Sequence, residues 1–432
     1  MVDQVIMGDP ATGSLPAPVI TRLATEMADP TSDVGASLSD TFDRARKNTV
    51  ILFGTSLEAA NGGPTDVLDP SSASYGSVLG WFNWANAFLL DQMVLVANAG
   101  VGGDTYAGML ARIDTDVLAN DSDWVFMGGP VNDIIQGRTY AQIVADANSI
   151  LDALKGRKIV ILTATATDLY STTEMKTVAA QINAWIRNLP RIRNAVAVVD
   201  AWNLVADKST GYAATGMTRA GDTLHWSSSA AMRIGRAVAT AITPMIEPAP
   251  PYHTFNGDPL SAVANPSMIS GTGWASTINN GTVAFSADAN FGGKVTLNIT
   301  GATTATTEII QYYESISGAR FAAGDVVQAT MRMKWSSYVP VGVAAAFIPI
   351  LYLWQRSVDG SWAKQGDSMF SSSGQNVVQV GVPASGEIVI RTPKFTVQSP
   401  TSPVNAIYAY VGLAGAASAV VEISDFSLRK IV

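Results

Sequence analysis

The chain has 432 residues, of which 47% are hydrophobic and 14% charged. This balance excludes wholesale disorder, and the length favours two or three domains, each able to bury a core. A formal net charge of −8 argues against nucleic-acid binding, and the absence of cysteine excludes disulfides, thiolate metal sites and a cysteine nucleophile.

Residues 1–48 are broken repeatedly by proline and glycine, with one helical pattern at Gly35–Lys47. They form either a poorly ordered terminus or a segment for attachment or oligomerisation. We expect no secretory signal, because no basic region is followed by an apolar stretch. We also expect no membrane insertion, since the apolar runs are too short or too interrupted to span a bilayer.

Residues 49–247 alternate between short β-branched runs and amphipathic helical patterns. The predicted strands are Thr49–Phe53, Val94–Asn98, Trp124–Gly128, Lys158–Thr163 and Val196–Asp200. The predicted helices are Val78–Leu90, Tyr106–Leu118, Tyr140–Leu154, Glu174–Leu189 and Ser229–Ile246. Apolar strands separated by such helices predict an α/β fold, in which a doubly wound parallel sheet lies between two helical layers. Active sites of these sheets gather at the carboxyl ends of the strands.

A proline-rich linker, residues 248–251, precedes a change of period from helical to two residues. The clearest alternation runs from Val327 to Trp335, and similar runs follow at Ala346–Gln355, Glu387–Arg391, Ile407–Leu413 and Val420–Leu428. Residues 252–432 are therefore predicted to form an antiparallel β-sandwich.

The first predicted strand leads into Gly54-Thr55-Ser56-Leu57-Glu58. Because glycine permits a tight turn, Ser56 could present its hydroxyl at the edge of the sheet. The segment is not a Gly-x-Ser-x-Gly elbow, since Glu58 occupies the last position. Taken alone, Ser56 fits an ordinary turn or cap serine better than a nucleophile.

Two further strand ends carry polar or glycine-rich segments. Asn98–Thr105 precedes a helix, and its glycines expose N–H groups that suit an oxyanion; a dinucleotide site fails because the third glycine would fall at Thr105. Asn132, in Gly128–Asp133, could donate an amide hydrogen into the same cleft, or form an Asx turn.

The segment before the last predicted helix contains Asp222 and His225. An aspartate three residues before a histidine can bond Nδ1–H and leave Nε2 free as a base. The alternative is a helix-entry aspartate beside a packed histidine. The other histidine, His253, lies beyond the linker and is the weaker candidate.

In this order the four segments resemble the blocks of the SGNH/GDSL hydrolase family. The nucleophile block corresponds to Gly54–Leu57, the oxyanion glycine block to Asn98–Thr105, the Gly-x-Asn-Asp block to Gly129–Asp133 and the Asp-x-x-His block to Asp222–His225. Two departures stand out: Thr55 replaces the usual aspartate, and one extra residue separates Gly129 from Asn132.

The resemblance implies acyl transfer without a metal or organic cofactor. Ser56, Asp222 and His225 would be catalytic, and the N–H groups of Ser56 and Gly103 with the Asn132 side chain would form the oxyanion hole.

The C-terminal half resembles jelly-roll carbohydrate-binding modules through Asn265–Trp274 and Val421–Leu428. Tyr352, Trp354 and Arg356 share one face of a predicted strand and could form a platform for sugar rings. The alternative is that most of the aromatic residues belong to the core.

Together these features predict a serine esterase that removes O-acetyl groups from a polysaccharide or other glycan. Two alternatives stay open: a glycan-binding adhesin or tail protein with a degenerate hydrolase domain, and a lipid or thioester hydrolase. We expect an acylated glycan as partner, and either a homo-oligomer or attachment to a larger particle through residues 1–48. The composition suits a virion tail component acting outside a cell; the other expectation is a cytoplasmic protein.

Overall fold

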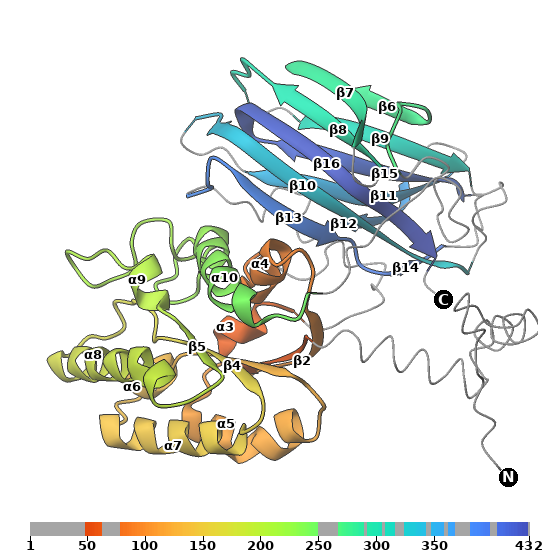
Figure 1. The fold of residues 1–432 in the computed structure, drawn as a ribbon. Coiled ribbons are helices and arrows are strands. Elements are labelled where there is room, and N and C mark those ends of the chain that lie inside the picture. The colour runs from red at the N-terminus through yellow and green to blue at the C-terminus, as the bar shows by residue number, and fades with distance from the viewer. Residues whose placement is uncertain are drawn as a thin grey trace, which may run out of the picture. The chain divides into compact units, whose positions relative to one another are not determined.

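The computed structural model describes residues 48–62, 78–248, 267–288, 292–304, 307–315, 324–342, 347–357, 362–367, 381–397 and 404–430 (Figure 1). The predicted helix at Gly35–Lys47, linker residues 249–251 and His253 lie outside these ranges.

Residues 48–248 contain a five-stranded sheet in the order β2-β1-β3-β4-β5. Its strands are β1 (Thr49–Gly54), β2 (Val94–Gly100), β3 (Trp124–Met127), β4 (Lys158–Leu162) and β5 (Val196–Val199). All neighbouring strands pair in parallel. The central strands β1 and β3 are almost wholly buried, because helices cover both faces of the sheet (Figure 1). The doubly wound parallel sheet predicted from the sequence is confirmed.

The helices of this domain fall into a long and a short class. The long helices are α4 (Trp81–Phe88), α5 (Tyr106–Ile113), α7 (Tyr140–Ala153), α8 (Thr173–Asn188) and α10 (Ser228–Ile242). Threonine or serine side chains accept the first free N–H groups of the last four, which explains where these helices begin. Figure 1 shows α5 and α7 on one face of the sheet and α4 and α10 on the other.

Three of the predicted helical regions differ from the observed helices, one at its start and two at their ends. The segment expected to be helical from Val78 begins only at Trp81, after Gly80. The helix predicted to run to Leu118 changes at Ile113 into a π-helical turn, Asp114–Leu118. The last one changes at Ile242 into a 3-10 turn, Thr243–Met245, because Pro244 cannot continue an α-helix. Another 3-10 turn, Leu189–Arg191, follows α8.

The short helices were not predicted. They are α3 (Ser56–Ala59), α6 (Val131–Ile135) and α9 (Ala201–Val205), and each follows directly on β1, β3 or β5. Four or five residues are too few to show a helical period. They nevertheless matter, because two of them carry predicted site residues.

The C-terminal region consists of two antiparallel sheets. One has the order β13-β10-β16-β8-β7, with β14 also pairing with β10; the other has the order β12-β11-β15-β9-β6. The strands are β6 (Trp274–Thr277), β7 (Gly281–Asp288), β8 (Gly292–Ile299), β9 (Thr307–Ser315), β10 (Val326–Pro340), β11 (Ile348–Ser357), β12 (Trp362–Asp367), β13 (Gly386–Arg391), β14 (Phe395–Thr396), β15 (Val404–Ala414) and β16 (Ala416–Lys430). The predicted alternation in β10 is confirmed, since its apolar positions from Val327 to Trp335 are buried.

Within the described ranges, no helix has the length and apolar character needed to cross a membrane.

Candidate active site

The turn after β1 presents Ser56 at the carboxyl edge of the sheet. Thr55 is the N-cap of α3, and Ser56 is the first residue of that helix. The Thr55 hydroxyl accepts the N–H of Leu57 at 3.3 Å, while the Glu58 carboxylate accepts the N–H of Thr55 at 2.7 Å. This reciprocal capping box holds the turn rigid. Ser56 itself is half-buried.

Hydrogen bonds join Ser56 to His225 and His225 to Asp222. Nε2 of His225 lies 3.0 Å from Oγ of Ser56, and Nδ1 lies 2.7 Å from Oδ2 of Asp222. An ionised carboxylate can only accept, so Nδ1 carries the ring hydrogen and Nε2 accepts from the serine. The structure thus brings together three residues that span 169 positions of the chain.

Asp222 is held ionised by its surroundings. Partial burial acts to raise its pKa, but the N–H groups of His225 and Leu224 and the ring of His225 outweigh that effect and lower the pKa to about 2. The two backbone N–H groups reach Oδ1 at 2.9 and 2.7 Å. Oδ2 is therefore left for the imidazole.

The segment that carries Asp222 and His225 is held by contacts within itself and by contact with the loop after β4. Thr218 pairs with Trp226 in an antiparallel bridge, and the N–H of Arg219 donates to the His225 carbonyl at 3.0 Å. Trp226 is buried and donates from Nε1 to the hydroxyl of Thr165 at 2.8 Å. The predicted alternative of a packed histidine does not describe this arrangement, because Trp226, and not His225, is the buried anchor.

The glycine-rich loop after β2 is open to solvent. Val101 is 46% exposed, and a Cβ atom added at Gly102 or Gly103 would meet nothing within 4 Å. Gly103 has φ +79°, a left-handed conformation that favours glycine. The loop is held from one side by α6, where Gln136 Nε2 donates to the Gly103 carbonyl at 3.2 Å.

Asn132 also contacts this loop. In the first turn of α6, its Nδ2 donates to the Asp104 carbonyl at 2.8 Å, which uses one of two amide hydrogens. The extra residue before Asn132 therefore leaves its side chain directed at the oxyanion loop. That Gly103 and Asn132 bind the oxyanion stays a prediction.

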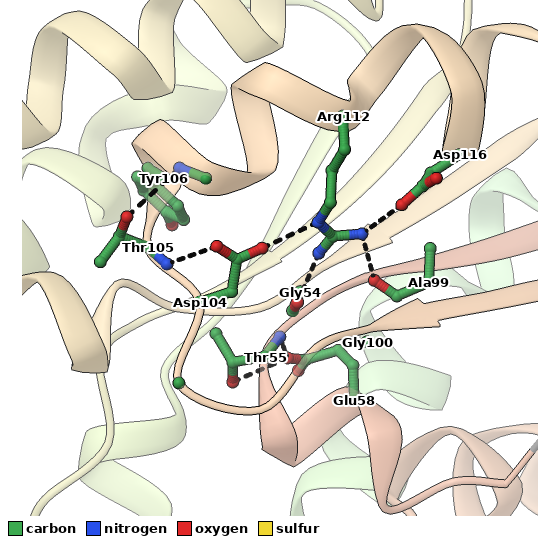
Figure 2. Close-up of polar contacts among 12 residues, drawn as sticks. Gly54, Thr55, Glu58, Ala99, Gly100, Asp104, Thr105, Tyr106, Arg112 and Asp116 are labelled. Atoms are coloured by element: carbon green, nitrogen blue, oxygen red, sulfur yellow. Dashed lines mark hydrogen bonds and ion pairs between the residues drawn. The ribbon is translucent and has the colours of Figure 1, made fainter.

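Arg112 of α5 joins three backbone segments around the site. Figure 2 shows its guanidinium donating to Asp104 in the glycine-rich loop, to the Gly54 carbonyl at the end of β1 and to the Ala99 carbonyl in β2, at 2.8, 2.9 and 2.8 Å. It also pairs with Asp116, one helical turn further on. The sequence analysis missed this residue; the Arg112–Asp116 spacing of four was the one local signal.

Glu58 is a second residue whose role the sequence did not reveal. Its side chain is fully buried, and it accepts hydrogen bonds from Thr55 and, at 3.2 Å, from Nε1 of Trp81. A Cβ atom at Gly54 or Gly128 would come within 2.2 or 2.3 Å of the Glu58 carboxylate, so these glycines create its niche. Burial outweighs the hydrogen bonds and raises the pKa of Glu58 to about 7.

The predicted sugar platform has a different setting. Tyr352 and Trp354 stack with their ring centroids 5.9 Å apart, and Trp354 also contacts Tyr410 at 4.9 Å. Tyr352 is only 8% exposed and belongs to a cluster separate from the main core, which takes the alternate residues Leu351 and Leu353. The burial of Tyr352 agrees with the alternative that these aromatic residues belong to the core, and sugar binding at this face stays a prediction. The side chain of Arg356 lies outside the described part.

A metal site finds no support in the residues described here. Among them, no three histidine or acidic side chains gather in a way that could hold a metal ion.

One known family model matches the part of the chain that contains the site residues. Residues 52–230 match the model of the GDSL-like lipase/acylhydrolase family, a stretch that includes Ser56, Gly103, Asn132, Asp222 and His225. No curated protein matches the chain.

Several solved structures are similar to the N-terminal half. A lipase/acylhydrolase from Enterococcus faecalis is 20% identical, with 47% of this chain and 100% of that chain covered and a TM-score of 0.38. A catalytic mutant of an acetylxylan esterase from Geobacillus stearothermophilus is 16% identical, with 45% and 94% covered and a TM-score of 0.37. TesA is 22% identical, with 46% and 99% covered and a TM-score of 0.35.

Proposed function

We propose that residues 48–248 form a serine esterase that removes O-acetyl groups from a glycan. The esterase assignment rests on two hydrogen bonds of His225: Nδ1 lies 2.7 Å from Oδ2 of Asp222, and Nε2 lies 3.0 Å from Oγ of Ser56. A serine activated by an oriented imidazole is the arrangement that acyl transfer requires.

The geometry supports a two-step reaction. Ser56 gives its proton to Nε2 of His225 and attacks the ester carbonyl, while Asp222 stabilises the imidazolium. The negatively charged oxygen of the tetrahedral intermediate is bound by the N–H groups of Ser56 and Gly103 and by the remaining Asn132 amide hydrogen. As the intermediate collapses, the bond to the sugar oxygen breaks and Nε2–H protonates that oxygen, which leaves as a sugar hydroxyl. A water activated by the same nitrogen then attacks the acyl-enzyme, releases acetate and restores Ser56.

A polymeric substrate is supported by the openness of the site. The side chains of His225 and Asp222 are 31% and 30% exposed, and Val101–Gly103 of the sequence-predicted oxyanion loop is also open to solvent. An ester on a bulky, hydrated chain can approach such a site without a lid having to move. The antiparallel domain that follows would add further contact surface, as the sequence predicts.

Two other functions compete with this one. A non-catalytic adhesin does not need an imidazole that is oriented towards a serine. The contacts of His225 with Asp222 at 2.7 Å and with Ser56 at 3.0 Å therefore favour an enzyme. A lipid or thioester hydrolase would use the same relay and must be separated by substrate.

The decisive experiment measures acetate released from a panel of acetylated glycans, beside a chain-length series of p-nitrophenyl esters. We expect acetate release from at least one glycan and a preference for the acetyl ester. Strong preference for long acyl chains would favour the lipid or thioester hydrolase. Absence of turnover, together with no labelling of Ser56 by a fluorophosphonate, would favour the adhesin; Ser56→Ala is the matched control for labelling.

A further inference from the structure

A pocket of about 260 Å³ lies beside α8, away from the three catalytic side chains. One face of α8 forms its floor through Lys176, Ala179, Ala180, Asn183 and Arg187. The walls come from three other segments that follow β4 and β5: Thr167 and Tyr170, Trp202 of α9, and Thr210–Tyr212.

The wall carrying Tyr212 is an ordered hairpin. Ala206 and Ala213 form an antiparallel bridge, and the N–H of Asp207 donates to the Tyr212 carbonyl at 2.8 Å. Gly211 takes φ +76°, which allows the turn that presents the next residue. Tyr212 is 38% exposed, so one side of its ring is available.

Charged groups line the pocket beside its aromatic rings. Arg187 holds Asp200 through two hydrogen bonds of 2.7 and 3.0 Å. Lys176 Nζ lies 5.2 Å from the centre of the Tyr212 ring and 3.5 Å from its hydroxyl. Within the described residues Lys176 has no carboxylate partner, so its ammonium can donate to a ligand's oxygen atoms.

The pocket is joined to the catalytic segment. The Thr167 hydroxyl, in its wall, donates to the carbonyl of Thr223 at 2.8 Å, and Thr223 follows Asp222 directly. In the sheet order β4 lies two strands from β1, or roughly 10 Å at about 4.8 Å per strand. The pocket and Ser56 therefore belong to the same carboxyl edge.

We infer that this pocket binds a sugar ring of the glycan chain that carries the ester, at a distance from the ring being deacetylated. The inference rests on the proposed function and names a subsite for it. Aromatic rings such as Trp202 and Tyr212 stack on the apolar face of a sugar, while Lys176 and Arg187, which also line the pocket, suit its hydroxyl groups. Ligand pockets usually measure about 300–1,000 Å³, so this smaller one suits a single ring better than a long acyl chain. Binding free energy gained in this pocket would help to lower the barrier for the reaction at the ester.

The test compares variants of the full chain on chemically acetylated xylo-, cello- and chito-oligosaccharides of increasing length. Tyr212→Ala and Lys176→Ala remove exposed groups, so neither should unfold the protein. For each variant, kcat/KM on the longer oligosaccharides is divided by kcat/KM on p-nitrophenyl acetate. We expect this ratio to fall by about tenfold in Tyr212→Ala and by several-fold in Lys176→Ala.

Matched controls remove similar groups outside the pocket. Ile192→Ala removes a more exposed hydrophobic side chain, and Lys155→Ala removes another exposed lysine of the same domain; both should keep the wild-type ratio.

The outcomes separate this inference from the proposed function. A wild-type protein that deacetylates oligosaccharides with no dependence on length, or pocket variants with an unchanged ratio, would overturn the subsite alone. Loss in the pocket variants confined to esters of long acyl chains would assign the pocket to an acyl group instead. Failure of the wild type on every acetylated glycan would overturn the proposed function itself.

Discussion

The Asp222 carboxylate accepts two hydrogen bonds from His225: Oδ1 accepts the backbone N–H at 2.9 Å, and Oδ2 accepts ring Nδ1–H at 2.7 Å. The first contact fixes the backbone on which the second depends, so the ring can point Nε2 only towards Ser56. With a pKa of about 2, Asp222 stays ionised over the whole working range of an esterase.

Replacing Asp222 by asparagine should weaken turnover without abolishing it. Asparagine can still accept the backbone N–H groups, but its amide favours the wrong ring tautomer of His225. We expect kcat to drop by about 10⁴-fold. Steady-state kinetics on p-nitrophenyl acetate would measure this, with His253→Ala as the control that should keep wild-type rates. A variant within a few-fold of wild type would show that Asp222 does not orient the base.

Removal of the nucleophile should be more severe. In Ser56→Ala the acyl-enzyme cannot form, and kcat should fall by about 10⁶-fold, the order seen when a triad serine is removed. Thermal unfolding followed by circular dichroism should give a midpoint close to wild type, because Ser56 is only half-buried and the change removes a single oxygen atom. Ester hydrolysis near the wild-type rate would remove the mechanism altogether.

The buried carboxyl of Glu58 should make the protein's stability depend on pH. Its pKa is raised by burial from 4.5 to about 7, so the folded state holds the proton more tightly than the unfolded state. Stability should therefore fall as pH rises from about 4.5 to 7 and level off above that, by on the order of 3 kcal/mol. In Glu58→Gln this part of the slope should disappear. Urea unfolding at a series of pH values would measure both proteins, and equal slopes would count against the assignment.

Arg112 should affect the chemical step through the position of the oxyanion loop. Lysine at this position keeps the charge but cannot reach Asp104, Gly54 and Ala99 together. In Arg112→Lys we expect kcat to fall by about 10- to 100-fold with KM for a small ester little changed, as for a misplaced oxyanion donor.

Arg157→Lys is the matched control for Arg112. Arg157 donates to the Ser122 hydroxyl and the Asn120 carbonyl, in contacts that involve no predicted site residue, and its variant should keep the wild-type kcat. Gly108→Ala offers an independent route to the same defect, because its Cβ would come within 1.8 Å of the Asp104 carboxylate that Arg112 holds. If Gly108→Ala and Arg112→Lys both retain full kcat, the loop does not depend on this contact.

The sequence by itself determined the order of elements and the four segments at the strand ends. Hydrophobic period is a local property, so the buried strand Thr49–Gly54 and the alternation in Val326–Pro340 could be read directly from neighbouring residues. Parallel strands also share one carboxyl edge, and this alone predicts that Ser56 and Asn132 lie at the same edge of the sheet. The local hydrophobic period did not predict α3, α6 and α9, because each is shorter than two helical turns.

Only the tertiary structure decided how the site is held. The 3.0 Å contact between Ser56 and His225 joins residues 169 positions apart, and no local pattern specifies such a distance. The niche of Glu58 is made by Gly54, at the end of β1, and Gly128, just after β3. The partners of Arg112 include two backbone carbonyls, which every residue type possesses equally. Packing likewise decided that Tyr352 lies buried in an aromatic cluster, since burial depends on what covers a sheet face and not on the alternation that creates it.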